Sequence, residues 1–188
     1  MKTRILTLVA VFMFATVATS VAQNKQIDTK ESKVNWTGYK VTGQHEGTID
    51  FKSGTLKFND GKLVGGTFVI DMSSINTTDL SGESKQNLDG HLKSDDFFGV
   101  AKYPTATLTF KKVVETDDNV YRVAADLKIK ESTSRVAFDI ELENSSAETT
   151  LKVDRTKFGI KYGSATFIDG LKDKAINDEF DLAVTLKY

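Results

Sequence analysis

The chain has 188 residues, with 25 Lys and Arg against 26 Asp and Glu, 39% hydrophobic residues, one Pro and no Cys. This balance is typical of one ordinary globular domain. The near-neutral charge argues against a protein that binds nucleic acid by phosphate neutralisation, so we expect no nucleic-acid partner. The absence of Cys excludes thiol catalysis, disulfides, Cys-ligated zinc and a lipoprotein anchor.

The N-terminus has the pattern of a secretory signal peptide. Lys2 and Arg4 precede an apolar run over residues 5–18, and small side chains follow at Ser20 and Ala22. The run of about 14 residues is shorter than the roughly 20 that a membrane-spanning helix needs. No second run of this kind follows. We therefore expect no transmembrane anchor.

Cleavage after Ala22 is predicted to divide the chain into a signal peptide, residues 1–22, and a mature domain, residues 23–188. The mature protein would then be periplasmic or secreted. Removal of the signal peptide takes away two bases and no acid, which leaves 23 bases against 26 acids. No linker, repeat or low-complexity run divides the mature part, so we expect one mildly acidic domain stabilised by packing.

Alternation with period two dominates the mature chain. Phe138, Ile140 and Leu142, for example, alternate with the charged residues Asp139 and Glu141. Such alternation is typical of strands with one buried and one solvated face. The same test predicts eight strands, near residues 33–42, 46–58, 63–73, 105–115, 119–130, 135–142, 147–155 and 180–187.

Eight antiparallel strands of about ten residues can form a sandwich or close into a barrel, and closure removes exposed strand edges. The hydrophobic phase slips by one residue at Gly38 and at Ser53–Gly54, as β-bulges would produce. The alternation alone leaves sandwich and barrel open. The lumen of an eight-stranded barrel is just wide enough to be filled by side chains or to hold one small ligand.

The longest interruption of the strand pattern, residues 74–104, contains a predicted helix. Asp79 or Ser81 can cap its N-terminus, Leu88 ends it, and Gly90 suits the left-handed position that follows a helix. This insertion is the place where a lid or plug of the fold would be sought.

The sequence carries no recognised catalytic signature. The two histidines, His45 and His91, are not spaced as zinc ligands, and nucleophile-elbow, phosphate-loop and dinucleotide motifs are absent. Asp95 and Asp96 could share acid and base roles, but after Ser94 they also fit the first turn of a short helix. We expect no metal, no cofactor and no enzymatic activity. Catalysis through Asp95, Asp96 and His91 is the least favoured alternative.

A series of short motifs links the chain to a known family. The most specific is the run His91–Phe98, which reads His-Leu-Lys-Ser-Asp-Asp-Phe-Phe. The others are Trp36–Gly38, His45–Gly47, Gly65–Phe68, Ile70–Ile75, Leu88–Gly90, Tyr103–Ala106, Asp154–Ser164 and Leu171–Asp178. With these motifs the mature chain resembles the YceI-like proteins, exported bacterial proteins of lipocalin-like fold associated with polyisoprenoid binding. One departure is Glu131, at a turn where the family leads us to expect Gly.

The resemblance implies an all-β, eight-stranded antiparallel lipocalin-like barrel that carries an apolar chain in its lumen. The ligand would be a polyisoprenoid, an isoprenoid quinone or a similar lipid, in envelope stress tolerance or transport. We expect Phe68, Ile70, Phe110, Phe138, Ile140 and Leu182 to line the lumen, with Trp36 near one end. Phe97 and Phe98 would close the mouth or plug it. His91 and Arg155 would contact a polar ligand head or make structural hydrogen bonds only.

Two alternatives concern partners. A barrel with a solid core would instead be an interaction module that binds another envelope protein through the 74–104 insertion. A head-to-head homodimer would let two mouths jointly enclose a tail too long for one barrel. The sequence leaves both open.

Overall fold

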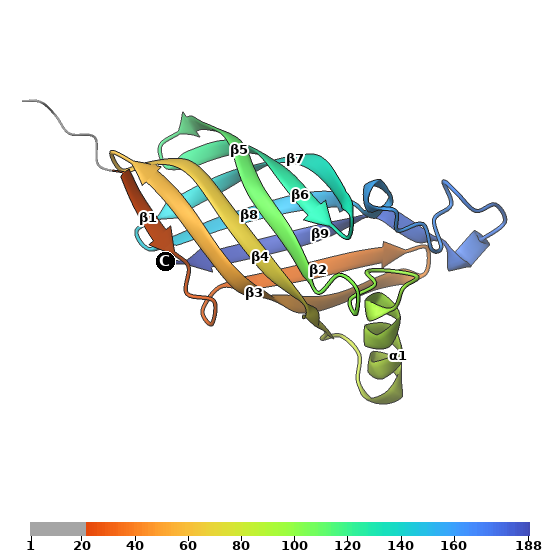
Figure 1. Ribbon diagram of the computed structural model, residues 1–188. Helices are drawn as coiled ribbons and strands as arrows, with labels where there is room; N and C mark the ends of the chain where they lie inside the picture. The colour runs from red at the N-terminus through yellow and green to blue at the C-terminus, as the bar shows by residue number, and fades with distance from the viewer. Residues whose placement is uncertain (1–21) are drawn as a thin grey trace, which may run out of the picture.

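The structure is a computed structural model that describes residues 22–188 (Figure 1). Its elements are β1 (Ala22–Gln26), β2 (Lys33–Lys40), β3 (Gly43–Asn59), β4 (Lys62–Thr77), α1 (Gly82–Lys93), β5 (Thr105–Asp117), β6 (Val120–Ile129), β7 (Ser132–Glu143), β8 (Ser146–Asp154) and β9 (Ile176–Lys187), with 3-10 turns η1 (Arg155–Phe158) and η2 (Lys172–Lys174). The predicted signal peptide lies outside the described residues, except for Ala22 at the start of β1.

The eight strands β2 to β9 form a closed antiparallel barrel. Each pairs with its neighbour in the chain, and β2 also pairs with β9, so that Trp36 lies opposite Leu182. The predicted eight-stranded barrel is confirmed, which settles the choice between sandwich and barrel. Closure gives both long edges of the sheet a hydrogen-bonding partner.

A ninth strand, β1, is not one of the eight barrel strands but pairs with one of them, β3. It pairs with the last residues of β3, from Ala22 opposite Asn59 to Gln26 opposite Thr55. The sequence analysis missed β1 because its five residues, Ala-Gln-Asn-Lys-Gln, show no apolar alternation. Such a strand is stabilised by its backbone pairing rather than by a buried face.

Bulges let the long strands bend around the barrel. The register between β3 and β4 shifts between Phe51 and Ser53, and that between β2 and β9 shifts between Gly38 and Lys40. Both lie where the hydrophobic phase slips in the sequence, so the predicted irregularities are confirmed. The extra residue of a bulge increases the local twist and curvature, which barrel closure requires.

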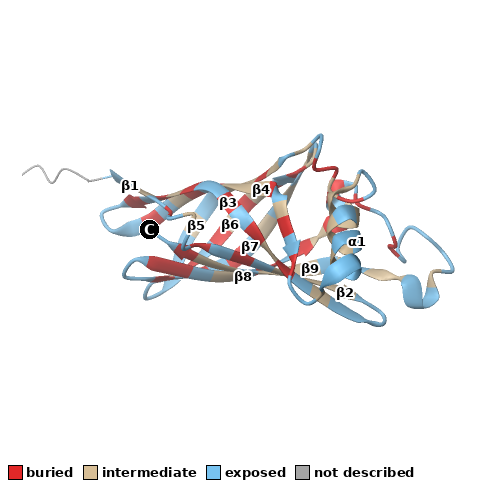
Figure 2. Ribbon diagram, turned by 90° about the horizontal axis from the view of Figure 1, so that it is seen from below, coloured by how far each residue is buried: buried red, intermediate tan, exposed pale blue. Residues whose placement is uncertain are grey.

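The interior is packed at one end and hollow at the other. Buried residues lie along the strands of the barrel (Figure 2). At the end that holds β1 and the β3–β4 hairpin, the core is filled by Leu56, Phe58, Leu63, Tyr121 and Leu142. Towards the other end, where α1 lies (Figure 1), the side chains surround a cavity.

Helix α1 is longer than predicted. It continues through Gly90 to Lys93, so the predicted end at Leu88, with Gly90 in a left-handed position, is wrong. Glycine inside a helix costs about 1 kcal/mol relative to alanine. Here the contacts of the residues after Leu88 offset that cost, because Asp89 bonds to Thr77 and Leu92 packs against the core.

Two local expectations are also resolved. Ser81 occupies the N-cap position of α1 in an extended conformation but makes no side-chain capping bond. Asp79, the other predicted cap, instead accepts hydrogen bonds from the backbone N–H of Glu46 and pairs with His45. At the β6–β7 turn the left-handed residue is Lys130, with φ of 55°, so Glu131 is spared positive φ.

Candidate functional site

A cavity of about 350 Å³ occupies the hollow end of the barrel. Its volume lies within the range of roughly 300–1,000 Å³ that is usual for small-molecule sites. All eight barrel strands and α1 contribute side chains to its wall, and most of these are aliphatic or aromatic. At the mouth the lining reaches exposed residues such as Lys40 and Glu179.

All of the candidate residues named from the sequence lie in the wall of this cavity: Trp36, Phe68, Ile70, His91, Phe97, Phe98, Phe110, Phe138, Ile140, Arg155 and Leu182. Their position in the wall is observed, and their contact with a ligand stays a prediction. Four aromatic rings form a continuous row across the interior. Phe68 lies between Phe51 and Phe110, at ring-centroid distances of 6.0 and 5.6 Å, and Phe110 lies 5.8 Å from Phe138.

The candidate residues named from the sequence make up only part of the cavity wall. Further apolar lining residues are Val34, Ile49, Phe51, Met72, Ile75, Leu88, Leu92, Ala106, Leu108, Leu127, Ile129, Leu151, Ile176, Phe180, Val184 and Leu186. The signal for most of them is the same alternation that pointed to the named residues. Met72, for example, follows Ile70 by two residues on β4, and Val34 precedes Trp36 by two on β2.

Trp36 stands on β2 with its indole half-buried in the wall. Its Nε1 donates a hydrogen bond to the backbone oxygen of Thr48 at 3.2 Å. The ring packs against Gly47, where an added Cβ would collide with both the indole and the backbone oxygen of Asn76. Glycine at position 47 therefore makes room for the Trp36 indole beside Asn76, at the end of β4.

The segment after α1 folds back over the mouth. Phe97 is buried, Phe98 is half-buried, and their rings meet edge to face at 5.1 Å. The backbone N–H of Phe98 donates to the oxygen of Leu92, and Lys130 donates to the oxygen of Phe97. These bonds hold two aromatic side chains against the opening, as either a cover or a plug requires.

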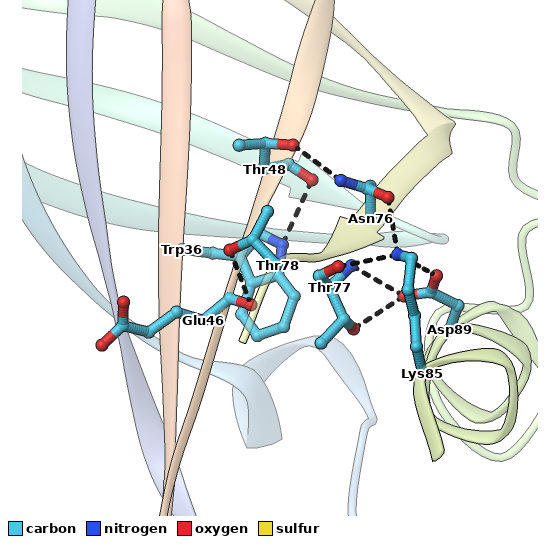
Figure 3. Close-up of polar contacts among 8 residues, drawn as sticks. All are labelled: Trp36, Glu46, Thr48, Asn76, Thr77, Thr78, Lys85 and Asp89. Carbon is cyan, nitrogen blue, oxygen red and sulfur yellow. Dashed lines mark hydrogen bonds and ion pairs between the residues drawn. The ribbon is translucent and has the colours of Figure 1, made fainter. Parts of the chain in front are cut away.

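A polar network fastens α1 to the end of β4 (Figure 3). One Asp89 oxygen accepts from the backbone N–H and the hydroxyl of Thr77, at 2.8 and 2.7 Å. Lys85 bonds to Asn76, to the oxygen of Thr77 and to Asp89, at 2.6 to 2.8 Å. Burial acts to raise the pKa of Asp89, but the hydrogen bonds from Lys85 and Thr77 outweigh it and lower the pKa below its usual value.

Arg155 begins η1 and is only 2% exposed. Burial lowers its pKa, and the nearby carboxylates of Asp178 and Asp154 oppose that shift. Its Nη2 lies 3.5 Å from Asp178 Oδ1. Its nitrogens also donate, at 2.8 to 3.0 Å, to the backbone oxygens of Ile160, Tyr162, Ile176 and Asn177. These contacts favour the structural role for Arg155, because they bind the segment between β8 and β9 into a loop.

His91, on the last turn of α1, is in a different situation. Its ring lies edge to face with Tyr162 and Phe97, at centroid distances of 4.4 and 5.7 Å. Its Nε2 is buried and has no hydrogen-bond partner in the described structure. A buried polar atom without a partner is uncommon in folded proteins. His91 is thus a residue of the cavity wall whose Nε2 is covered by protein atoms and left unpaired.

The remaining polar candidates do not assemble into a catalytic group. Asp95 and Asp96 are exposed in the turn after α1, outside the wall of the cavity. Ser94 donates its hydroxyl to the oxygen of His91 at the end of α1, so it does not cap a following turn as expected. Within residues 22–188, no three acidic, His or Cys side chains are placed to hold a metal ion. Over the same residues, no helix is long and apolar enough to cross a membrane.

The family model of the YceI-like domain matches residues 26–188 of this chain. The chain belongs to the YceI-like family. A UPF0312 protein of Staphylococcus aureus strain USA300 is 32% identical over an alignment of 124 residues, which covers 60% of this chain. The match spans 66% of that relative, just under two thirds of its length.

Several solved structures have the same fold as this YceI-like protein. BcnA of Burkholderia cenocepacia superposes with a TM-score of 0.68 at 20% identity, over 85% of this chain and 98% of BcnA. A polyisoprenoid binding domain from Saccharophagus degradans gives 0.60 at 16%, over 86% and 97%. The YCEI protein of Campylobacter jejuni gives 0.54 at 18%, over 100% and 98%. At these identities the likeness shows the fold.

Proposed function

We propose that this YceI-like protein binds one apolar chain, a polyisoprenoid, an isoprenoid quinone or a similar lipid, inside the barrel. The observation that carries the proposal is the apolar cavity of about 350 Å³, walled by side chains from every barrel strand. The Saccharophagus degradans protein of the same fold is described as a polyisoprenoid binding domain, which supports the ligand class. The protein acts as a binder and carrier rather than as an enzyme.

The transfer free energy of apolar groups favours an apolar ligand in this cavity. The cavity should select only weakly for the length of the ligand chain. Each CH₂ group that leaves water contributes roughly 0.8 kcal/mol, so a few isoprene units offset the entropic cost of association. Lining residues such as Phe138 and Ile140 offer no polar side-chain group that would fix one carbon position. The alternative of a solid-core interaction module has weaker support, because a filled barrel would need no cavity.

Native mass spectrometry tests the proposal directly. Protein purified from a bacterial envelope without detergent should carry about one equivalent of lipid, which organic extraction then identifies. Ile140→Trp should lose it, since Ile140 is 1% exposed and a larger side chain there fills the cavity. Ala137→Trp is the matched control, because Ala137 lies on the exposed face of the same strand. Circular dichroism establishes that both variants are folded.

Two results would reject a carrier function. One is a lipid-free mass that stays unchanged after incubation with prenyl, quinone and fatty-acyl lipids. The other is equal lipid content in Ile140→Trp and Ala137→Trp. Either result would favour an interaction module that uses the surface of residues 74–104.

We propose further that the protein is exported and works in the cell envelope, where a carrier of apolar molecules supports stress tolerance. The support is the signal-peptide pattern of residues 1–22. N-terminal sequencing of protein from a fractionated envelope should begin at Gln23. In that product Gln23 to Gln26 still pair with β3. Recovery of the protein in the cytoplasm with Met1 retained would exclude export.

A further inference from the structure

Exposed apolar side chains gather at the end of the barrel where the cavity opens. Six large hydrophobic side chains are exposed among the described residues, and four of them belong to this end: Val41, Tyr162, Phe167 and Ile168. Figure 1 shows that the connection between β8 and β9, which carries three of the four, extends beyond the strands at this end. The other two, Val64 and Val114, lie towards the packed end.

Two contacts connect these side chains with the mouth of the cavity. The Tyr162 ring, 49% exposed, lies edge to face on His91, a residue of the cavity wall, at a centroid distance of 4.4 Å. The backbone N–H of Val41, just after β2, donates to the oxygen of Ala175 at 3.2 Å. The turn between β2 and β3 therefore lies beside the β8–β9 connection, and both border the opening.

The β8–β9 connection is also basic, whereas the mature chain as a whole is mildly acidic. Residues 157–175 contain Lys157, Lys161, Lys172 and Lys174 against Asp169 and Asp173. The Nζ of Lys161 lies 4.5 Å from the ring centroid of Phe167, so a cation stands directly beside an exposed apolar ring. Apolar side chains can enter the boundary between lipid head groups and acyl chains, and neighbouring lysines attract anionic head groups.

A second copy of the chain fits this surface less well than a lipid bilayer does. In a symmetric dimer each copy presents the same patch to the other, so the lysines of the two β8–β9 connections would approach one another. Like charges placed across an interface are unfavourable. An anionic lipid surface complements both the charge and the apolar side chains.

We propose that the docking face, formed by Val41, Tyr162, Phe167 and Ile168, attaches the protein to the surface of a bilayer that contains anionic phospholipids. The exposed acids Asp95 and Asp96 follow α1, so the lysine-bearing connection rather than the α1 side would meet the lipid.

Docking in this orientation brings the mouth of the cavity against the bilayer. An apolar chain then passes between bilayer and barrel with little exposure to water, which avoids the main cost of transferring it. Docking goes beyond the proposed function, and only its use in loading the barrel rests on the binding of an apolar chain there.

Vesicle flotation tests docking with protein purified from a bacterial envelope without detergent. The vesicles consist of phosphatidylcholine alone or of equal parts phosphatidylcholine and phosphatidylglycerol. The unmodified protein should bind the mixed vesicles more tightly, and added salt should weaken this binding. The double variant Phe167→Ser/Ile168→Ser should lower the partition coefficient at least about tenfold.

The matched control is Val64→Ser/Val114→Ser, which removes two exposed apolar side chains from the packed end. This control should bind like the unmodified protein, and circular dichroism establishes that both double variants are folded. Lys174→Gln should weaken binding to the mixed vesicles roughly fivefold and leave binding to phosphatidylcholine unchanged. Lys57→Gln, at an exposed position of β3 towards the packed end, should have no such effect.

Docking is overturned if the unmodified protein does not float with the mixed vesicles, or if the two double variants lose binding equally. A dimer in analytical ultracentrifugation that only Phe167→Ser/Ile168→Ser dissociates, without vesicle binding, would make this face an interface between copies. Lipid-loaded protein that does not float overturns docking alone. Lipid-free protein that floats and takes up no lipid supports docking while the carrier function fails.

Discussion

The guanidinium of Arg155 lies over the ring of Phe97, with 5.6 Å between its Cζ atom and the ring centroid. Phe97 belongs to the segment after α1, and Arg155 begins the segment that joins β8 to β9. This contact therefore joins the two longest connections at the mouth of the barrel. Both sides of the opening depend on one buried cation.

Loss of Arg155 should destabilise the protein strongly. Arg155→Met removes the hydrogen bonds to four backbone oxygens and leaves Asp178 without its ion-pair partner. We expect the free energy of unfolding in urea to fall by about 3–5 kcal/mol, as for other broken buried pairs.

The control for Arg155 is Arg122→Met. Arg122 pairs with Asp139 on the exposed outer wall, and exposed pairs contribute little. The urea midpoint for unfolding of the Arg122→Met variant should stay close to that of the unmodified protein. Similar losses in the two variants would contradict the role given to Arg155.

The Asp89 network predicts how stability changes with pH. Because the folded-state pKa of Asp89 is lowered, its contribution is present above the unfolded value of about 3.9 and is lost as the pH falls through the lower folded value. Urea unfolding of Asp89→Asn should therefore depend less on pH than that of the unmodified protein, between about pH 5 and pH 2.

Removal of the whole Asp89 side chain has a separate effect at neutral pH. Asp89→Ala leaves the N–H of Thr77 and the ammonium of Lys85 without this acceptor, at a cost of about 1–3 kcal/mol. A pH dependence identical in Asp89→Asn and the unmodified protein would show that this carboxylate does not control acid stability.

Gly47 should be intolerant of even a methyl group. In Gly47→Ala the new Cβ collides with the Trp36 indole and the Asn76 backbone, and overpacking of this kind costs about 1–3 kcal/mol. Trp36 is the single Trp of the chain, so its fluorescence spectrum reports the displacement.

Gly65 provides the matched comparison on β4. Its nearest non-neighbouring atom would lie 3.6 Å from an added Cβ, in ordinary contact with the Lys57 side chain. Gly65→Ala should leave the fluorescence unchanged and stabilise the protein by about 0.4–1 kcal/mol, through the unfolded chain. A change of spectrum in Gly65→Ala equal to that in Gly47→Ala would undermine the steric explanation.

Truncation of Phe68 should lower the free energy of unfolding and enlarge the cavity. Phe68 is 3% exposed and touches the rings of Phe51 and Phe110, so Phe68→Ala should cost about 3–5 kcal/mol in urea unfolding. Val64→Ala, on an exposed part of the same strand, should change stability by less than about 0.5 kcal/mol. Equal effects would mean that the ring row does not support the wall.

The wall of the cavity was accessible to sequence reasoning because a period of two maps directly onto one face of a strand. Phe68, Ile70, Phe138 and Ile140 could be assigned to the interior without knowing which strands meet. The eight barrel strands and the two bulges follow from the same signal. Barrel closure does not, because it depends on β2 meeting β9.

The features that sequence reasoning missed depend on distant contacts. The cost of placing Gly90 in a helix can be read from the local sequence. The hydrogen bond between Asp89 and Thr77, which favours the continuation of α1 past this glycine, depends on the position of the end of β4. A structural role for Arg155 was among the expectations, but its partners could not be named, because they are backbone oxygens beyond Gly159 that carry no side-chain signature. The pairing of β1 likewise uses backbone groups alone.

The pairing of β2 with β9 determines when the binding site can exist. Val34 and Val184, which face each other across this seam, lie near opposite ends of the described chain. A chain that emerges with its N-terminus first must hold seven barrel strands before the last one arrives, with β2 and β8 as unpaired edges. Such long-range closure is slow and leaves the intermediate prone to aggregation. The ability to capture a ligand is therefore acquired in the final step of folding, when β9 seals the wall.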